Sequence, residues 1–491
     1  MSTVRKSLAF SALDSYVGLV LSIASTVVIA RILTPEQTGV FAVAAVFASL
    51  ASTFRDFGVA EYLIQERELT DAMIRAALSV NIAISWVMAM LLFVLAPLVA
   101  DFYRSPGVAQ VMQVQSVNFL LIPFGAVTMA WFRREMNMKP IFIAGLVANI
   151  VSFVVSITLA LHGFGFMSLA WSSLAGVAVT VAVSVWMRPA AFPRWPGLQG
   201  IGRVLQFGKF ASGVYIFGQA GKGAPEMIIG RAQDMAAVGM FSRGNGLVEI
   251  FNRLVLRSIM PVCLPYFAKG VREHGSPKPG LLTAMSYLTA VGWPFLLIMG
   301  IGAYSAIRLM YGAQWLAAVP LSQLLCAAAA LELIYYPAKE AMLSLGKARE
   351  SNSLQLGIQA LRVAGLLAAV PFGLAGACWG LLVAALLGAG LSHWYLAKLL
   401  GLRLADCMTA LLPSLAVSLM AALPMAVWAL VSPIGEHNYI TVSLVGGALG
   451  ALGWIGALCA LRHPLWSELT ALTWPLWSRL RGEKRASTPR N

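Results

Sequence analysis

Charged side chains are scarce in this sequence. Only 11% of its 491 residues are Asp, Glu, Lys or Arg, while 59% are hydrophobic, and the mean hydropathy is +0.79. A soluble globular protein carries about 25% charged residues, so this chain has too little charge to cover a surface in water. The composition excludes that class and predicts an all-α polytopic protein of a membrane.

Signatures of catalysis and metal binding are also missing. The five cysteines stand singly, without CxxC or Cys/His spacing, and the five histidines do not cluster. There is no phosphate-binding P-loop and no Gly-x-Ser-x-Gly nucleophile elbow. A membrane glycan polymerase or ligase, the rival from the enzyme class, would need a larger outer loop than the one near 305–316. We therefore expect no enzyme, no metal and no cofactor.

Long apolar runs are what the sequence has in abundance. Fourteen of them reach the roughly 20 residues that a membrane-crossing helix needs. The first follows Arg5 and Lys6 without a convincing small-residue cleavage site, so we expect a retained helix rather than a signal peptide. The runs lie near 8–30, 38–60, 77–99, 112–132, 141–162, 167–187, 207–230, 238–262, 283–304, 317–337, 353–372, 375–397, 409–430 and 440–461.

The basic residues orient these spans. With both termini in the cytoplasm, 25 of the 35 Lys and Arg residues fall in inner segments, 4 in outer loops and 6 inside spans. This asymmetry follows the positive-inside rule and explains the net charge of +15 without invoking nucleic acid. It predicts that both termini lie in the cytoplasm.

The chain also repeats itself. An offset of 200 residues aligns Arg31 with Arg231 and Gly39 with Gly239, and further matches pair Phe10/Phe210, Gly18/Gly218, Ile29/Ile229 and Phe41/Phe241. We expect two parallel six-helix lobes, at 1–200 and 201–400, around a central cavity. A helix pair at 401–462 and a basic, amphipathic and disordered cytoplasmic tail at 463–491 would follow.

Two stretches carry a resemblance to a known family. "RILTPEQTGVFAVAAVFASLASTFRDFGVAEYLIQERELT" (31–70) is similar to the N-terminal signature of Wzx-type polysaccharide transporters, and "VGMFSRGNGLVEIFNRLVLRSIMPVCLPYFA" (238–268) resembles their eighth-helix pattern. This family is a branch of the multidrug/oligosaccharidyl-lipid/polysaccharide exporter superfamily. Within it the chain looks most like exopolysaccharide exporters of the succinoglycan type.

The resemblance implies a MATE-like flippase that moves undecaprenyl-pyrophosphate-linked oligosaccharides by alternating access. Its partners would be the lipid-linked oligosaccharide, membrane lipids and glycan-assembly proteins such as a polymerase, and it would act as a monomer. Coupling to H⁺ or Na⁺ is left open. The alternative is a multidrug or cation antiporter of the same fold, which would favour a mainly acidic cavity.

Ionisable residues inside spans are candidates for function, because each costs about 2.5–3.5 kcal/mol to insert. A pyrophosphate needs cationic partners at membrane depth. The candidate cavity cations are Arg55, Lys222, Arg243, Arg253, Arg257 and Arg362. The candidates for ion coupling or charge pairing are Asp14, Asp56, Glu226 and Glu249, and a polar lumen is expected at Asn245, Asn352, Gln355 and Gln359.

The run at 238–262 is the richest of these. Asn245, Glu249, Arg253 and Arg257 follow at intervals of four, which drifts slowly around one helix face. Glu249 and Arg253 are in the favourable order for an ion pair, whereas Arg243 and Arg257 lack a local partner. The pattern favours a cavity wall for phosphate oxygens, and a self-neutralised helix with Arg257 reaching to the cytoplasm is the alternative.

The other charged spans leave both structural and functional interpretations open. Lys222 and Glu226 flank glycines and Pro225, which indicates either a bending cavity helix or a kinked structural one. The stripe through Gln359 and Arg362 suits a sugar-binding lumen or hydrogen bonding between helices. Asp14 lies beside small residues that most often pack against another helix.

Arg55 and Asp56 stand inside the apolar run 38–60. The orientation puts Arg55 about 7.5 Å from the cytoplasmic end of that span. It would either line the cytoplasmic mouth of the cavity, where a lipid-pyrophosphate headgroup arrives, or extend to the headgroups of the bilayer.

Overall fold

The architecture is taken from a computed structural model of the chain. It describes residues 3–55, 58–189, 192–193, 195–211, 213–431 and 434–471, with side chains throughout except at 3–9, 11, 12, 14, 207–211 and 213–217. The described segments are helical and contain no strand. The chain divides into two compact units, and each is described by itself. Unit 1 contains residues 1–244, 310–318 and 359–380, and unit 2 contains residues 245–309, 319–358 and 381–491.

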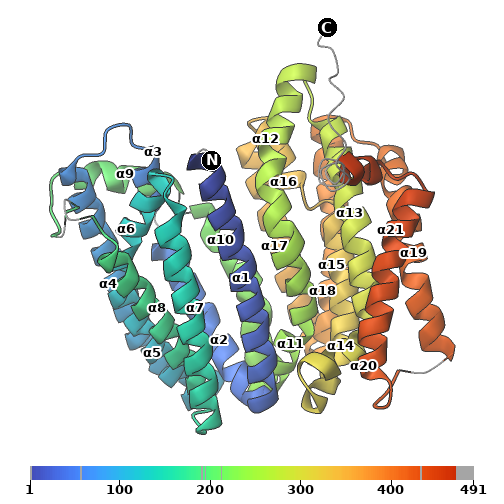
Figure 1. The fold of residues 1–491 in the computed structure, drawn as a ribbon, viewed down its shortest axis with the longest axis horizontal. Helices are drawn as coiled ribbons and strands as arrows, with labels where there is room; N and C mark the ends of the chain where they lie inside the picture. Colours follow the sequence, from blue (N-terminus) through green and yellow to red (C-terminus); the bar gives the residue numbers. More distant parts are fainter. Residues whose placement is uncertain are drawn as a thin grey trace, which may run out of the picture. The chain divides into compact units, whose positions relative to one another are not determined.

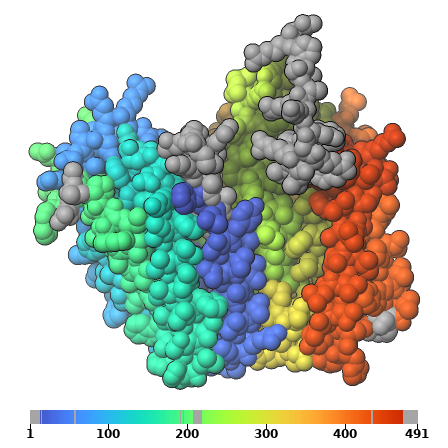
Figure 2. Space-filling model, in the orientation of Figure 1, coloured from blue at the N-terminus to red at the C-terminus, as the bar shows by residue number. Residues whose placement is uncertain are grey.

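Unit 1 is built mainly from the first ten helices. Figure 1 shows α1, α7 and α8 running side by side, and α2 packs against both α5 and α10. In the space-filling view α1 and α7 adjoin on the visible face (Figure 2). The helices are α1 (Thr3–Ile32), α2 (Pro35–Arg55), α3 (Val59–Gln65), α4 (Asp71–Tyr103), α5 (Pro106–Leu121), α6 (Pro123–Arg134), α7 (Met138–Leu161), α8 (Met167–Trp186), α9 (Ile201–Ala211) and α10 (Gly213–Ala232).

Unit 2 begins inside helix α11 (Met235–Phe251), so the boundary between the units falls within this helix. In unit 2, α13 packs against α15 and α19, and α19 packs against α21. Helices α17 and α18 each continue from one unit into the other. The remaining elements are η1 (Asn252–Leu256), α12 (Arg257–His274), α13 (Lys278–Ile301), α14 (Ala303–Met310), η2 (Ala313–Ala318, in unit 1), α15 (Val319–Ile334), α16 (Ala338–Ser344), α17 (Ala348–Ala369), η3 (Val370–Phe372, in unit 1), α18 (Gly373–Leu400), α19 (Leu404–Val431), α20 (Tyr439–Thr441), η4 (Val442–Gly446) and α21 (Gly447–Ala460).

Ten helical stretches of the described residues are long and apolar enough to cross a membrane, or eleven with the bent pair α5 and α6. The stretch 348–400 counts once although it holds both α17 and α18. The α9–α10 and α11–α12 segments do not qualify, and these are the segments richest in charge. The prediction of a polytopic all-α membrane protein is confirmed.

Three predicted spans are less regular than the sequence indicates. In the run 38–60, α2 is described as far as Arg55, Gly58 takes a left-handed φ of 74°, and the short α3 follows it. The run 112–132 is bent by 53° where Pro123 opens α6. In the run 238–262, η1 is a π-helical turn, which shifts the register of every residue after it.

Helices α2 and α11 begin in the same way. Thr34 and Gln37 form a reciprocal capping box at the start of α2, with Gln37 N donating to Thr34 Oγ1 (3.3 Å) and Thr34 N to Gln37 Oε1 (3.2 Å). At the start of α11, Ala237 N donates to Asp234 Oδ1 (2.7 Å). The "LTPEQ" motif therefore has a local physical reason, and the equivalent position 200 residues later also starts a helix, with Asp234 in place of Thr34.

These two helix starts cross at a pair of glycines within unit 1. A Cβ on Gly39 would overlap the backbone carbonyl of Met235, and a Cβ on Gly239 would overlap that of Pro35. Each partner is the other's equivalent at the offset of 200 residues. The contact is therefore reciprocal about a local pseudo-two-fold axis, and only glycine allows the backbones to come this close.

Candidate functional site

The predicted site residues separate into two groups. Unit 1 holds Arg55, Lys222, Glu226, Arg243, Gln359 and Arg362, whereas unit 2 holds Asn245, Glu249, Arg253, Arg257, Asn352 and Gln355. Asp56 and the side chain of Asp14 lie outside the described residues. The role of these residues in binding stays a prediction, but their surroundings differ between the units.

In unit 1 the side chains of α10 and α17 face each other. Gln359 packs its amide directly against Gly221, and Arg362 lies within electrostatic range of Glu226. The ends of the two helices meet where Gln233 Nε2 donates to the carbonyl of Val370 (3.5 Å). Helix α10 continues unbroken through Pro225, and Val46 of α2 packs onto Gly223. Glycines of α10 thus provide close helix packing.

Glu226, Arg243 and Arg362 lie in one layer of unit 1. At 1.5 Å per residue, Glu226 is about 9 Å before the end of α10, Arg243 about 12 Å after the start of α11, and Arg362 about 10 Å before the end of α17. The α10 and α17 ends adjoin, and a short turn joins α10 to α11. The three charges therefore stand at similar depth in adjacent helices.

Several polar atoms of this layer are buried without a hydrogen bond. They are Glu226 Oε2, Arg243 Nε and Gln359 Oε1, and none of the three has a partner in the described part of the chain. Buried polar groups in proteins are nearly always hydrogen-bonded, because an unpaired group loses its hydration without compensation. Three such atoms in unit 1 are therefore the strongest candidates in the described residues for contact with a polar ligand.

Arg243 is held by two aromatic rings. Its Cζ lies 5.4 Å from the ring centroid of Tyr311 and 5.4 Å from that of Trp315. Both aromatic residues belong to unit 1 and are fully buried. The sequence analysis did not identify them, because they come from a segment far along the chain and show no pattern there.

In unit 2 the predicted ion pair between Glu249 and Arg253 is confirmed. Arg253 Nε donates to Glu249 Oε1 (3.0 Å), and Asn252 Nδ2 donates to Glu249 Oε2 (3.3 Å). Arg257 is the first residue of α12, after the π-helical turn, and has no ion pair among the described residues. The regular drift of this stripe around one face is therefore interrupted after Arg253.

Arg55 is the last described residue of α2 and lies within the candidate membrane span Pro35–Gln65. It is half-buried, with its Cζ 6.0 Å from the ring centroid of Phe119 in α5. This contact fixes the arginine at a helix end within unit 1. Lys222 is exposed on α10.

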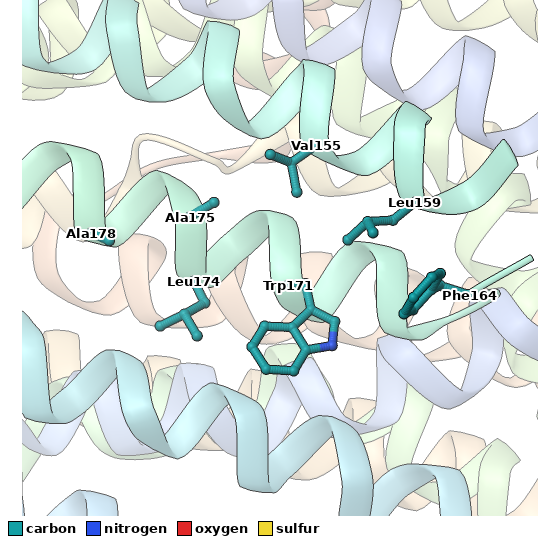
Figure 3. Close-up of a pocket in the computed structure, with 7 residues that line it drawn as sticks. All are labelled: Val155, Leu159, Phe164, Trp171, Leu174, Ala175 and Ala178. Atoms are coloured by element: carbon teal, nitrogen blue, oxygen red, sulfur yellow. The ribbon is translucent and has the colours of Figure 1, made fainter. Parts of the chain in front are cut away.

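A groove of about 430 Å³ lies between α7 and α8, away from these charges. It is lined by apolar side chains, and Phe164 and Trp171 stand at one end of it (Figure 3). None of the predicted site residues lines it. An all-apolar groove on a membrane-spanning helix pair suits lipid and offers no polar contact to a sugar or a phosphate.

Long apolar helices with a layer of unpaired polar atoms define a multi-pass membrane transporter class. Residues 28–320 match the family described as "Polysaccharide biosynthesis protein", and the chain belongs to this family. It is a multi-pass bacterial membrane protein.

Individual relatives and a solved structure agree with this family. The chain is 26% identical over 336 residues to the succinoglycan biosynthesis transport protein ExoT of Rhizobium meliloti, a match that spans 66% of this chain and 65% of that one. It is 24% identical over 356 residues to the lipopolysaccharide biosynthesis protein WzxC of Escherichia coli, over 71% of each chain. The fold is similar to the lipid II flippase MurJ in an inward closed conformation, with a TM-score of 0.72 at 13% identity, covering 94% of this chain and 99% of MurJ.

Proposed function

We propose that this chain is a flippase that moves undecaprenyl-pyrophosphate-linked oligosaccharides across the bacterial inner membrane for exopolysaccharide or lipopolysaccharide biosynthesis. The proposal includes no chemical change to the substrate. Its topology is fourteen crossings with both termini in the cytoplasm, and two six-helix lobes at 1–200 and 201–400 alternate in access. Lipids and a glycan polymerase are its partners, and it acts as a monomer.

The layer of Glu226, Arg243, Gln359 and Arg362 in unit 1 carries this proposal. A lipid-linked oligosaccharide brings phosphate oxygens, which accept hydrogen bonds from guanidinium groups, and sugar hydroxyls, which both donate and accept. Such a ligand offers hydrogen bonds to both kinds of unbonded atom. Arg243 Nε is a donor and needs an acceptor, while Glu226 Oε2 and Gln359 Oε1 are acceptors and need donors. A small lipophilic cation would leave the arginine donors unsatisfied.

The test is transport by the full-length protein in proteoliposomes. The probe is a radiolabelled undecaprenyl-pyrophosphate-linked oligosaccharide, and a glycan-cleaving enzyme outside the vesicle reports which molecules have crossed. We expect flux in the wild type and a loss of at least about thirtyfold when both Arg243→Gln and Arg362→Gln are present, because each removes a charged hydrogen-bond donor. Wild-type vesicles that exchange a cationic drug for Na⁺ or H⁺, but do not move the lipid-linked glycan, would instead establish the antiporter.

Glu226 is the group that we propose for ion coupling. Glu249 is already paired with Arg253, whereas Glu226 Oε2 has no hydrogen-bond partner and faces the charge of Arg362. In the same vesicles, an imposed H⁺ or Na⁺ gradient should change the flux in the wild type and not in Glu226→Gln. Equal flux with and without both gradients in the wild type would rule out coupling.

A further inference from the structure

Arg243 differs from the other arginines in how its charge is held. Tyr311 and Trp315 approach it through their ring faces, and these two rings are 1% and 0% exposed. No described carboxylate lies within ion-pairing distance of it, and its Nε has no hydrogen-bond partner. The guanidinium is thus positioned by rings instead of by a counterion.

The mode of contact matters for what the arginine can still bind. A cation–π contact is an attraction between the positive charge and the face of a ring, and it does not require an N–H donor to bond to an acceptor atom. An ion pair consumes such donors. Arg308 of unit 2 provides the contrast: it stacks on Tyr439 at 5.3 Å, but its Nε also donates to both oxygens of Glu436 (2.9 Å each).

The two rings are themselves held in place by the end of α1. Trp315 Nε1 donates to the carbonyl of Ala30 (2.7 Å), and Gln314 Nε2 donates to the carbonyls of Ala30 (2.6 Å) and Leu33 (3.1 Å). The last carbonyls of a helix have no partner within the helix, so this short segment caps α1 while it fixes the indole. A rigid support of this kind keeps the guanidinium in one place before a ligand arrives.

We propose that Tyr311 and Trp315 are positioning residues that hold the donor edge of Arg243 ready for anionic oxygens of the substrate. This inference rests on the proposed function and adds to it the residues that orient the cation. The ligand chemistry is a pair of oxygens that share negative charge, which a pyrophosphate or the carboxylate of an acidic sugar would supply. The rings stabilise the cation without competing with that ligand.

The experiment compares ring-retaining and ring-deleting variants of nearly equal volume. Trp315→Phe and Trp315→Leu both lose the hydrogen bond to Ala30, but only phenylalanine keeps a face for Arg243; Tyr311→Phe and Tyr311→Leu form the second pair. The full-length protein in nanodiscs is titrated with undecaprenyl pyrophosphate without sugar and, separately, with a soluble glucuronate-containing oligosaccharide. The probe that binds identifies the source of the anion.

We expect each leucine variant to bind the anion about tenfold more weakly than its phenylalanine counterpart. In an Arg243→Gln background that difference should vanish, because the rings act only through the arginine. The control is Tyr439→Leu, which removes a ring from an arginine whose donors are already occupied and should leave the affinity unchanged. If a leucine variant at 315 does not fold, the pair at 311 gives the same comparison.

Equal affinities within both pairs, or a ring effect that persists without Arg243, would overturn the inference. Failure of the proposed flippase function would give a different result, because the wild-type protein would then move no lipid-linked oligosaccharide at all. If flux is normal in Arg243→Gln, the role proposed for Tyr311 and Trp315 is wrong, whereas the proposed flippase function is unaffected.

Discussion

Arg243 in unit 1 and Arg253 in unit 2 are only ten residues apart in the chain, yet their charges are stabilised in opposite ways. Arg253 donates to Glu249 one turn earlier, and both side chains are more than a third exposed. Arg243 stacks between two buried rings that come from a distant segment and keeps an unbonded donor. The comparison teaches that two arginines of one charged segment can differ in whether a hydrogen-bond donor stays unused, and this difference is the basis of our proposal for Arg243.

The largest expected effect is on transport. Arg243→Gln should lower the flux of lipid-linked oligosaccharide by about thirtyfold or more, because a charged donor is lost from a buried place. Arg253→Gln should lower it less than about threefold, since that charge is already neutralised by Glu249. Initial rates in proteoliposomes at matched protein density measure both, and a larger loss for Arg253→Gln would reverse our comparison of the two units.

The second effect concerns packing. Gly39→Ala or Gly239→Ala should destabilise unit 1 by about 1–3 kcal/mol, because the added methyl group meets a backbone carbonyl that cannot move aside. Gly390→Ala in unit 2 is the matched control, since a Cβ there meets nothing within 4 Å and alanine favours the helix. Thermal unfolding in detergent should separate them, and a control as unstable as the other two would remove the packing argument.

The third effect is a pH dependence confined to unit 2. His463 is 1% exposed, with Nε2 3.2 Å from the hydroxyls of Ser286 and Ser414 and Nδ1 accepting from Leu465 N–H (3.1 Å). Burial lowers its pKa from the ordinary value of 6.5, so the unfolded state binds the proton more readily and stability falls as the pH drops below about 6.5.

The segment after His463 should report this change. Residues 464–471 are helical, and Leu465, Trp466 and Leu469 pack against a buried cluster of α13, α19 and α21. Hydrogen exchange in that segment should accelerate between pH 7.5 and pH 5.5, after correction for the intrinsic rate, while unit 1 stays unchanged. His463→Gln should remove the difference. A pH dependence that survives the substitution would assign it to another group.

The smallest effect is the loss of the Glu249–Arg253 pair. Glu249→Gln should cost only about 0.3–0.5 kcal/mol of stability, the usual value for an exposed pair one turn apart. It also removes the carboxylate that pairs with Arg253 and so makes this arginine more like Arg243, which has no ion pair among the described residues. If binding of undecaprenyl pyrophosphate then strengthens, unused donors are sufficient for anion binding. If it does not, buried aromatic rings such as Tyr311 and Trp315 are also required.

Local features of this molecule could be predicted from its sequence. The helix starts at Pro35 and Met235, the repeat of Arg31 and Arg231 and the Glu249–Arg253 pair depend on residues close together in the chain, where spacing fixes geometry. The sequence also predicted Arg243 as a cavity cation, but it did not distinguish this arginine from the other five candidates.

The features that distinguish those cations depend on tertiary contacts. The rings around Arg243 come from a loop in which one Trp and one Tyr carry no periodic signal. The bend at Pro123 could be expected, because proline interrupts a helix. The π-helical turn at Asn252–Leu256 contains no such residue, and it shifts Arg257 out of register.

The reciprocal contact of Gly39 and Gly239 is arranged like the interface of a symmetric homodimer, where residue i meets residue j and j meets i. In such a dimer any mutation appears on both sides of the axis at once. In this single chain each side is encoded separately, so one glycine can be changed while the other is kept. The chain can therefore acquire an asymmetry at its centre that no pair of identical subunits could hold.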